Sequence, residues 1–201
     1  MPNRKAQSTP FSNLSAFQKE SDDVNVVIET PKGSRNKFNY DEELGLFKLG
    51  GVLPAGAVFP FDFGFVPSTL GGDGDPLDVL LLMDEPAFTG CLVASRLLGV
   101  IEAEQTEDGE TMRNDRLIAV ASDSRTHKGV RSLQSLNETL LDEIVHFFIS
   151  YNEMKDKIFK PLGRFGPQRA RELVVEGEEL FRRKNRTQKA GKRRTATRKK
   201  R

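Results

Sequence analysis

The chain has one cysteine, no tryptophan and only two histidines among its 201 residues. A single cysteine, Cys91, cannot form an internal disulfide, which fits the reducing environment of the cytoplasm. His127 and His146 are far apart in the sequence, so a zinc site built from histidine and cysteine is not expected. Neither a disulfide scaffold nor a zinc-binding protein of this type is therefore predicted.

Long hydrophobic runs are also missing. No apolar stretch approaches the roughly 18–20 residues that a membrane-spanning helix needs. The first 20 residues are polar and lack the apolar core of a secretion signal. These absences predict a cytoplasmic protein without a membrane association, of a length that fits one domain with a full hydrophobic core.

The formal net charge of +2 conceals a strong asymmetry. Residues 182–201 hold 12 of the 31 Lys and Arg residues and none of the 29 acidic residues, so the rest of the chain is strongly acidic. A run this basic does not fold alone, and we expect segments 1–23 and 184–201 to be disordered. The basic tail is expected either to contact nucleic acid or another polyanion weakly, or to act as a solubilising extension. The lack of aromatic residues for base stacking favours the second alternative.

The order of sequence patterns predicts a β-rich domain over 24–183 that ends in helices. Alternating and β-branched residues, together with turn signals, predict strands at 24–29, 37–40, 46–49, 77–83, 91–104 and 116–121. Apolar residues at helical spacing predict a helix over 137–153, with Asn137 as its N-cap, and a second helix from 167 to about 184. We therefore expect an antiparallel barrel with a hairpin and two late helices.

An aromatic segment lies in the middle of the β-rich region. Its four phenylalanines fall within seven positions, at 59, 61, 63 and 65. Strand alternation would place all four on one face, where aromatic rings mostly serve core packing.

The most informative stretch is D-G-D-P-L-D at 73–78, in which Asp73, Asp75 and Asp78 lie on a turn formed around glycine and proline. The mutual repulsion of three crowded carboxylates can be relieved by a hard divalent cation. Mg²⁺ takes oxygen ligands, keeps several waters and usually binds beside substrate phosphates. The alternative is an ordinary solvated turn.

Three segments together resemble the soluble family I inorganic pyrophosphatases. They are the acidic run at 73–78, the aromatic run F-P-F-D-F-G-F at 59–65 and the late helical segment 144–151. The resemblance covers about residues 24–183. It implies a mainly β, α+β fold with a five-stranded OB-like closed barrel, and Mg²⁺-dependent hydrolysis of pyrophosphate to two phosphates, with Mn²⁺ as an alternative ion. It also implies assembly into a homo-oligomer.

The resemblance further implies roles for single residues. Asp75 would accept a proton from the attacking water, and the metal ligands would be Asp73, Asp75, Asp78 and, through an outer shell, Glu29, with Asp115 as a ligand in a shifted register. The phosphates would be bound by Lys37, Arg116 and Tyr151. Such an arrangement meets the needs of the reaction, which must neutralise a compact polyanion and activate water.

Several positions depart from the family pattern. Neutral amides stand where the resemblance leads us to expect charged side chains, at Asn39, Gln105, Asn114 and Asn152. Gly51 or a neighbour stands in place of an arginine, and Phe59 and Phe63 stand in place of tyrosines. We therefore expect weaker metal binding and lower activity. Two alternatives stay open: a phosphohydrolase of an organic or nucleotide diphosphate, and a non-catalytic binding module with a nucleic-acid-binding tail.

Overall fold

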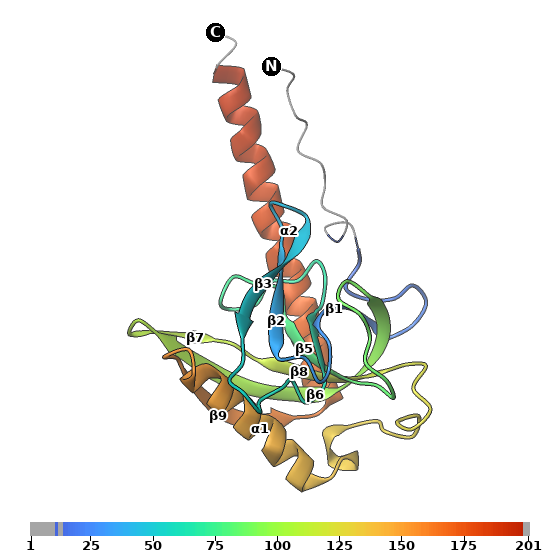
Figure 1. Ribbon diagram of the computed structural model, residues 1–201. Coiled ribbons are helices and arrows are strands. Elements are labelled where there is room, and N and C mark those ends of the chain that lie inside the picture. The colour runs from blue at the N-terminus through green and yellow to red at the C-terminus, as the bar shows by residue number, and fades with distance from the viewer. Residues whose placement is uncertain (1–10, 12–13, 199–201) are drawn as a thin grey trace.

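The computed structural model describes residue 11 and residues 14–198, with side chains described as far as residue 187. Figure 1 shows the arrangement of its elements, whose bounds are β1 (Val24–Thr30), β2 (Asn36–Asp41), β3 (Leu46–Val52), β4 (Asp62–Phe65), β5 (Asp78–Leu82), β6 (Leu92–Glu107), β7 (Glu110–Arg113), β8 (Arg116–Ala121), a 3-10 turn (Leu133–Ser135), α1 (Glu138–Glu153), β9 (Ile158–Phe165) and α2 (Pro167–Arg198).

Five strands form a closed ring in the order β1-β4-β5-β8-β6, because β6 also pairs with β1. This ring confirms the predicted mainly β fold with two late helices. The expectation of a purely antiparallel barrel was wrong in one place, since β5 and β8 run parallel. Between β5 and β8 the chain runs through the long strand β6, which is antiparallel to β8. The chain thereby turns back, and β8 runs in the same direction as β5. This parallel pairing sets Asp78 directly beside Arg116.

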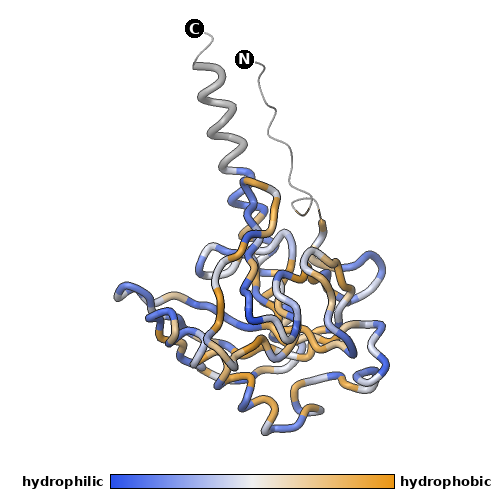
Figure 2. Tube along the Cα trace, in the orientation of Figure 1, coloured by the Kyte–Doolittle hydropathy of each residue, from blue (hydrophilic) through white to orange (hydrophobic). Residues whose placement is uncertain are grey.

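Three of the ring strands, β5, β6 and β8, contribute apolar side chains to two core clusters on opposite faces. On β5, Leu80 and Leu82 belong to the cluster that α1 covers, whereas Val79 and Leu81 belong to the cluster that α2 covers. Because both faces are buried, these strands read as continuous apolar runs rather than as alternating ones. Figure 2 shows the resulting concentration of hydrophobic residues in the ring.

The remaining strands lie outside the ring. β2 and β3 form the predicted hairpin as a separate two-stranded sheet, while β7 and β9 extend the sheet by pairing with β6. The patterns did not predict β7 or β9. In β9, Pro161 and Gly163 disfavour a strand assignment. The predicted helix over 137–153 is confirmed as α1, and the Asn137 side chain accepts a hydrogen bond from the Thr139 N–H at 2.8 Å.

Both ends of the domain differ from the expected disorder. The Leu14 carbonyl accepts a hydrogen bond from the Ser68 hydroxyl at 2.7 Å, and Ala16 is fully buried. At the other end, α2 continues through the predicted tail to Arg198, because Lys, Arg, Ala and Gln favour helix. Residues 1–10, 12–13 and 199–201 lie outside the described part. Within the described residues, no helix is both long and apolar enough to cross a membrane.

Candidate active site

The acidic run forms a loop, here called the aspartate loop (residues 71–78), that leads into β5. The buried Thr69 hydroxyl accepts a hydrogen bond from the Leu77 N–H at 3.1 Å, which joins the residues that come before the loop to its last residues. Inside the loop, the Asp73 carboxylate accepts a hydrogen bond from the Asp75 N–H at 3.1 Å. Glycine at position 74 is required because its φ is +89°. The loop therefore has a defined shape.

A cavity of about 810 Å³ opens beside this loop. Its walls come from the aspartate loop, the β2–β3 hairpin, the ends of α1 and β6, and the middle of α2. The structure brings together at this cavity seven of the eight residues that the sequence predicts for the site: Glu29, Lys37, Asp73, Asp75, Asp78, Arg116 and Tyr151. Of the four aromatic-segment phenylalanines, Phe61 alone does not line it.

Asp78 and Arg116 form a mostly buried ion pair in the cavity wall. The Arg116 Nη1 atom lies 2.7 Å from an Asp78 carboxylate oxygen, and the arginine side chain is only 5% exposed. The guanidinium lies over the rings of Phe148 and Phe159, at 5.2 and 5.5 Å from their centroids. Burial raises the pKa of the Asp78 carboxyl, and the Arg116 charge opposes that rise. The pair holds the arginine rigidly at the cavity.

Glu29 and Lys37 form a second buried pair, with 2.7 Å between the Lys37 Nζ and a Glu29 carboxylate oxygen. The ammonium lies 4.5 Å from the centroid of the Phe63 ring. The other Glu29 oxygen accepts a hydrogen bond from the Tyr40 N–H at 2.8 Å. Burial raises the pKa of the Glu29 carboxyl, while Lys37 lowers it. Both Glu29 oxygens are thus engaged by groups of the protein itself.

Asp115 is the one predicted site residue that does not line the cavity. Its carboxylate accepts hydrogen bonds from the Ala103 N–H at 2.9 Å and from the Arg113 guanidinium at 2.8 Å. The carboxylate is thus used to hold β6 next to β8. The structure therefore does not support the shifted register that would make Asp115 a metal ligand.

The four neutral amides all line the cavity: Asn39, Gln105, Asn114 and Asn152. The Asn114 side-chain amide donates a hydrogen bond to the Gln105 side-chain carbonyl at 3.0 Å, so the two face each other across neighbouring segments. Asn152 is 2% exposed and donates to the Phe148 carbonyl at 2.8 Å. The cavity therefore carries a neutral, hydrogen-bonded wall where the resemblance leads us to expect charge.

Seven charged residues of the cavity wall were not predicted as site residues: Asp41, Glu42, Lys48, Glu107, Lys155, Lys157 and Lys184. Lys48 pairs with Asp41 at 2.7 Å across the hairpin, and Lys157 pairs with Glu107 at 2.6 Å. Lys155 and Lys157 follow the predicted residue Tyr151 closely in sequence, which was a usable signal. For Lys184, no sequence signal separated it from the rest of the basic tail.

The carboxylates at the cavity are the groups that could hold a divalent cation. Among the described residues, no group of three or more Asp, Glu, His or Cys side chains converges on one point. The described residues therefore do not form a site that would replace all the waters of a metal ion. Mg²⁺ ordinarily keeps several waters and binds only one or two carboxylates. Burial raises the pKa of the Asp73 carboxyl to about 6, and the nearby Asp78 and Asp75 charges add to the rise. A cation at the loop would offset this cost, so the residues fit a hydrated ion.

The raised pKa of Asp73 predicts a pH-dependent metal affinity. Ionised carboxylate binds the cation and the protonated form does not, so affinity falls as pH drops through about 6. Between pH 7.5 and pH 5 we expect about a tenfold loss of Mn²⁺ affinity, measured by isothermal titration calorimetry. Asp73→Asn should flatten this profile. An Mn²⁺ affinity equal at both pH values in the unmodified protein would contradict the assignment.

Comparison with known proteins agrees with this geometry. Residues 26–182 match the family model described as inorganic pyrophosphatase. The inorganic pyrophosphatase of Synechocystis sp. is 38% identical over 140 residues, covering 70% of this chain and 80% of that protein. Soluble inorganic pyrophosphatase 2 of Chlamydomonas reinhardtii is 35% identical over 180 residues, covering 89% and 91%.

A solved structure shows the same fold. The crystal structure of inorganic pyrophosphatase from Thermus thermophilus superposes with a TM-score of 0.78 at 33% sequence identity, and the alignment covers 86% of this chain and 98% of that one. Together with the family match over most of the length, this shows that the chain belongs to the inorganic pyrophosphatase family.

Proposed function

We propose that this protein hydrolyses inorganic pyrophosphate to two phosphates with the help of divalent cations. The observation that carries the proposal is that one cavity brings together the aspartate loop (residues 71–78), Lys37 and Arg116. Carboxylates bind the cations, while the lysine and the arginine bind the phosphates as a point charge and a planar fork. Pyrophosphate with bound metal ions matches both the carboxylates and the basic side chains of the cavity.

The cationic and phenolic residues are proposed to hold the substrate. Arg116 is fixed by Asp78, and Lys37 by Glu29, so neither side chain must be ordered when the anion binds. Tyr151 stacks on Phe147 with 5.9 Å between ring centroids. Burial raises the pKa of the Tyr151 phenol, so its hydroxyl stays protonated at neutral pH and can donate a hydrogen bond to a phosphate oxygen.

The carboxylates are proposed to divide two tasks. Asp73 and Asp78 bind the cation, and Glu29 contacts it through water. When bound, Mg²⁺, or Mn²⁺ as the alternative, neutralises phosphate charge and lowers the pKa of the attacking water. Asp75 is exposed at the loop, where its carboxylate can accept the proton that this water releases.

The neutral amides are proposed to reduce metal affinity and turnover relative to a fully carboxylated site. Asn can still offer a carbonyl oxygen to a cation, but it supplies no charge. Gln105 and Asn114 already satisfy each other, which lowers the tendency of either to bind an ion.

Phosphate release is the direct test of the proposed function. Pyrophosphate should be hydrolysed with Mg²⁺ or Mn²⁺, and EDTA should abolish the reaction, while nucleotides and sugar phosphates assayed in parallel release little. A preference for one of those esters would instead support the alternative phosphohydrolase. Release from none of the substrates would favour the binding module and overturn the proposal.

Assembly into a homo-oligomer and weak polyanion contact through 184–201 stay predictions from the sequence. The resemblance supports the first, and the charge of the tail supports the second. A cytoplasmic location is proposed on the same sequence grounds.

A further inference from the structure

We infer that Lys184, at the point where helix α2 enters the basic tail, is a pyrophosphate-binding residue of this protein. The inference rests on the proposed function. It adds to the site a basic side chain that lies outside residues 26–182, the part of the chain that matches the family.

Helix α2 passes directly over the aspartate loop. The Gly177 carbonyl accepts a hydrogen bond from the Leu70 N–H at 3.1 Å. A Cβ at position 177 would lie 3.0 Å from a Leu77 methyl carbon, so glycine permits this close approach in the middle of the helix. Two turns later, Phe181, Lys184 and Asn185 form part of the cavity wall.

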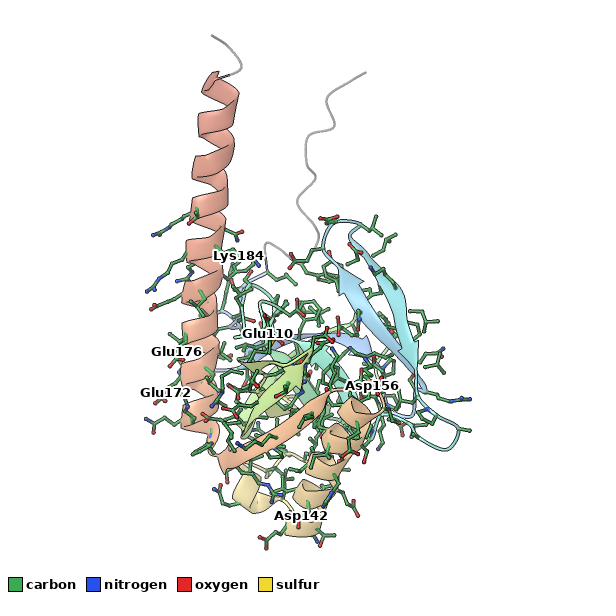
Figure 3. All side chains as sticks on the ribbon, turned by 90° about the vertical axis from the view of Figure 1, so that its left-hand side faces the viewer. Glu110, Asp142, Asp156, Glu172, Glu176 and Lys184 are labelled. Atoms are coloured by element: carbon green, nitrogen blue, oxygen red, sulfur yellow. The ribbon has the colours of Figure 1, made fainter. Side chains whose placement is uncertain are left out.

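The side chain of Lys184 is directed to the loop. Its Nζ lies 3.5 Å from the Gly74 carbonyl oxygen, which is long for a hydrogen bond and leaves the ammonium free to move to a stronger acceptor. Figure 3 shows Lys184 on the side of α2 that faces the strands, whereas Glu172 and Glu176 lie on the outer side. The position thus places the ammonium at the backbone of the aspartate loop, in the wall of the same cavity as the three aspartates.

Lys184 also differs from the other cations of the cavity wall. Carboxylates lie within 2.7 Å of four of them: Lys37, Lys48, Arg116 and Lys157. A fifth, Lys155, lies 4.5 Å from the centroid of the Tyr151 ring. Among the described contacts of Lys184 there is no carboxylate, although its neighbours Arg182 and Arg183 pair with Glu178 and Glu179. Its full positive charge is therefore available to a phosphate.

This cation would replace one that the hairpin lacks. The resemblance places a phosphate-binding arginine near position 51, where the chain has glycine, and the nearest base, Lys48, is occupied by Asp41. A lysine supplied by α2 reaches the same cavity from the opposite wall, and a point charge on a flexible stem suits a phosphate end.

Kinetics of point variants test this inference. Lys184→Gln should raise KM for pyrophosphate about fivefold to tenfold, with kcat within about twofold, because a charged contact to the ground-state anion is lost. Lys184→Arg should restore most of the affinity. The matched control is Arg183→Gln, next along the helix, whose side chain is 74% exposed, pairs with Glu179 and does not line the cavity; it should leave KM unchanged.

Binding and truncation make the test independent of turnover. Calorimetric affinity for non-hydrolysable imidodiphosphate in the presence of Mg²⁺ should fall as KM rises in Lys184→Gln. A chain ending at Asn185 should retain wild-type affinity, and one ending at Phe181 should lose it. If the wild type fails to hydrolyse pyrophosphate, the proposed function is overturned while imidodiphosphate binding still tests Lys184. Unchanged imidodiphosphate affinity in Lys184→Gln would overturn the assignment of Lys184 alone.

Discussion

Asp75→Asn should lower kcat for pyrophosphate by about two to four orders of magnitude while the protein stays folded. The amide preserves the size of the side chain but cannot accept the proton of the attacking water, and general-base catalysis contributes about that much. Asp75 is exposed, and the described hydrogen bonds that it makes in the loop use its backbone N–H and carbonyl rather than its carboxylate. The backbone of the aspartate loop should therefore be unaffected.

Three measurements separate lost chemistry from lost structure. Initial rates of phosphate release give kcat, thermal unfolding followed by circular dichroism reports the fold, and calorimetry with Mn²⁺ reports metal binding. The last two should change little. Asp123→Asn provides the matched control, since Asp123 is an exposed aspartate in a turn and does not line the cavity. Turnover near the wild-type rate in Asp75→Asn would show that another group accepts the proton.

Arg116→Gln should damage both stability and substrate binding. Removing the arginine leaves the Asp78 carboxylate, whose pKa burial already raises, without its partner. Loss of one member of a buried pair costs about 3–5 kcal/mol, and the partial exposure of Asp78 reduces this to about 2–3 kcal/mol. KM for pyrophosphate should rise tenfold or more, because the planar fork that binds the phosphate is lost.

Urea unfolding gives the free-energy change of this variant, and initial rates give its KM. Arg164→Gln is the control, because Arg164 also pairs with an aspartate, Asp142, but at the surface and away from the cavity. That exposed pair should contribute less than about 1 kcal/mol. If the two variants lose equal stability, the buried pair contributes no more than an exposed one and our account of the cavity wall is wrong.

Much of the fold could be read from local patterns. Most of the strands, the hairpin and α1 with its Asn137 cap follow from alternation, helical spacing and capping chemistry, which act over a few residues, whereas β7 was not predicted. β9 could not be found this way, because pairing with β6 overrides the poor strand preference of its proline and glycine. Helix α2 was predicted to end near residue 184 but continues, since nothing in the sequence interrupts helix at that point.

The candidate site was predictable to the extent that its residues are clustered in sequence. The turn at 73–78 places three carboxylates together by chain connectivity alone, and that is enough to suggest a cation and a phosphate substrate. The amide positions Gln105 and Asn114 were also identified, although their hydrogen bond to each other was not. Asp115 lies in the short connection between β7 and β8, and its carboxylate contacts Ala103 and Arg113, which the sequence did not indicate.

The sequence by itself thus determined the family, the elements and the acidic half of the cavity, because those depend on short-range patterns and covalent order. The tertiary structure decided which charges meet: Arg116 lies against Asp78 because β5 and β8 pair in parallel, and Lys184 lies against Gly74 because α2 crosses the aspartate loop at Gly177. These contacts join residues up to 110 positions apart. No local pattern encodes such pairs, since they exist only after the ring closes and the helices pack onto it.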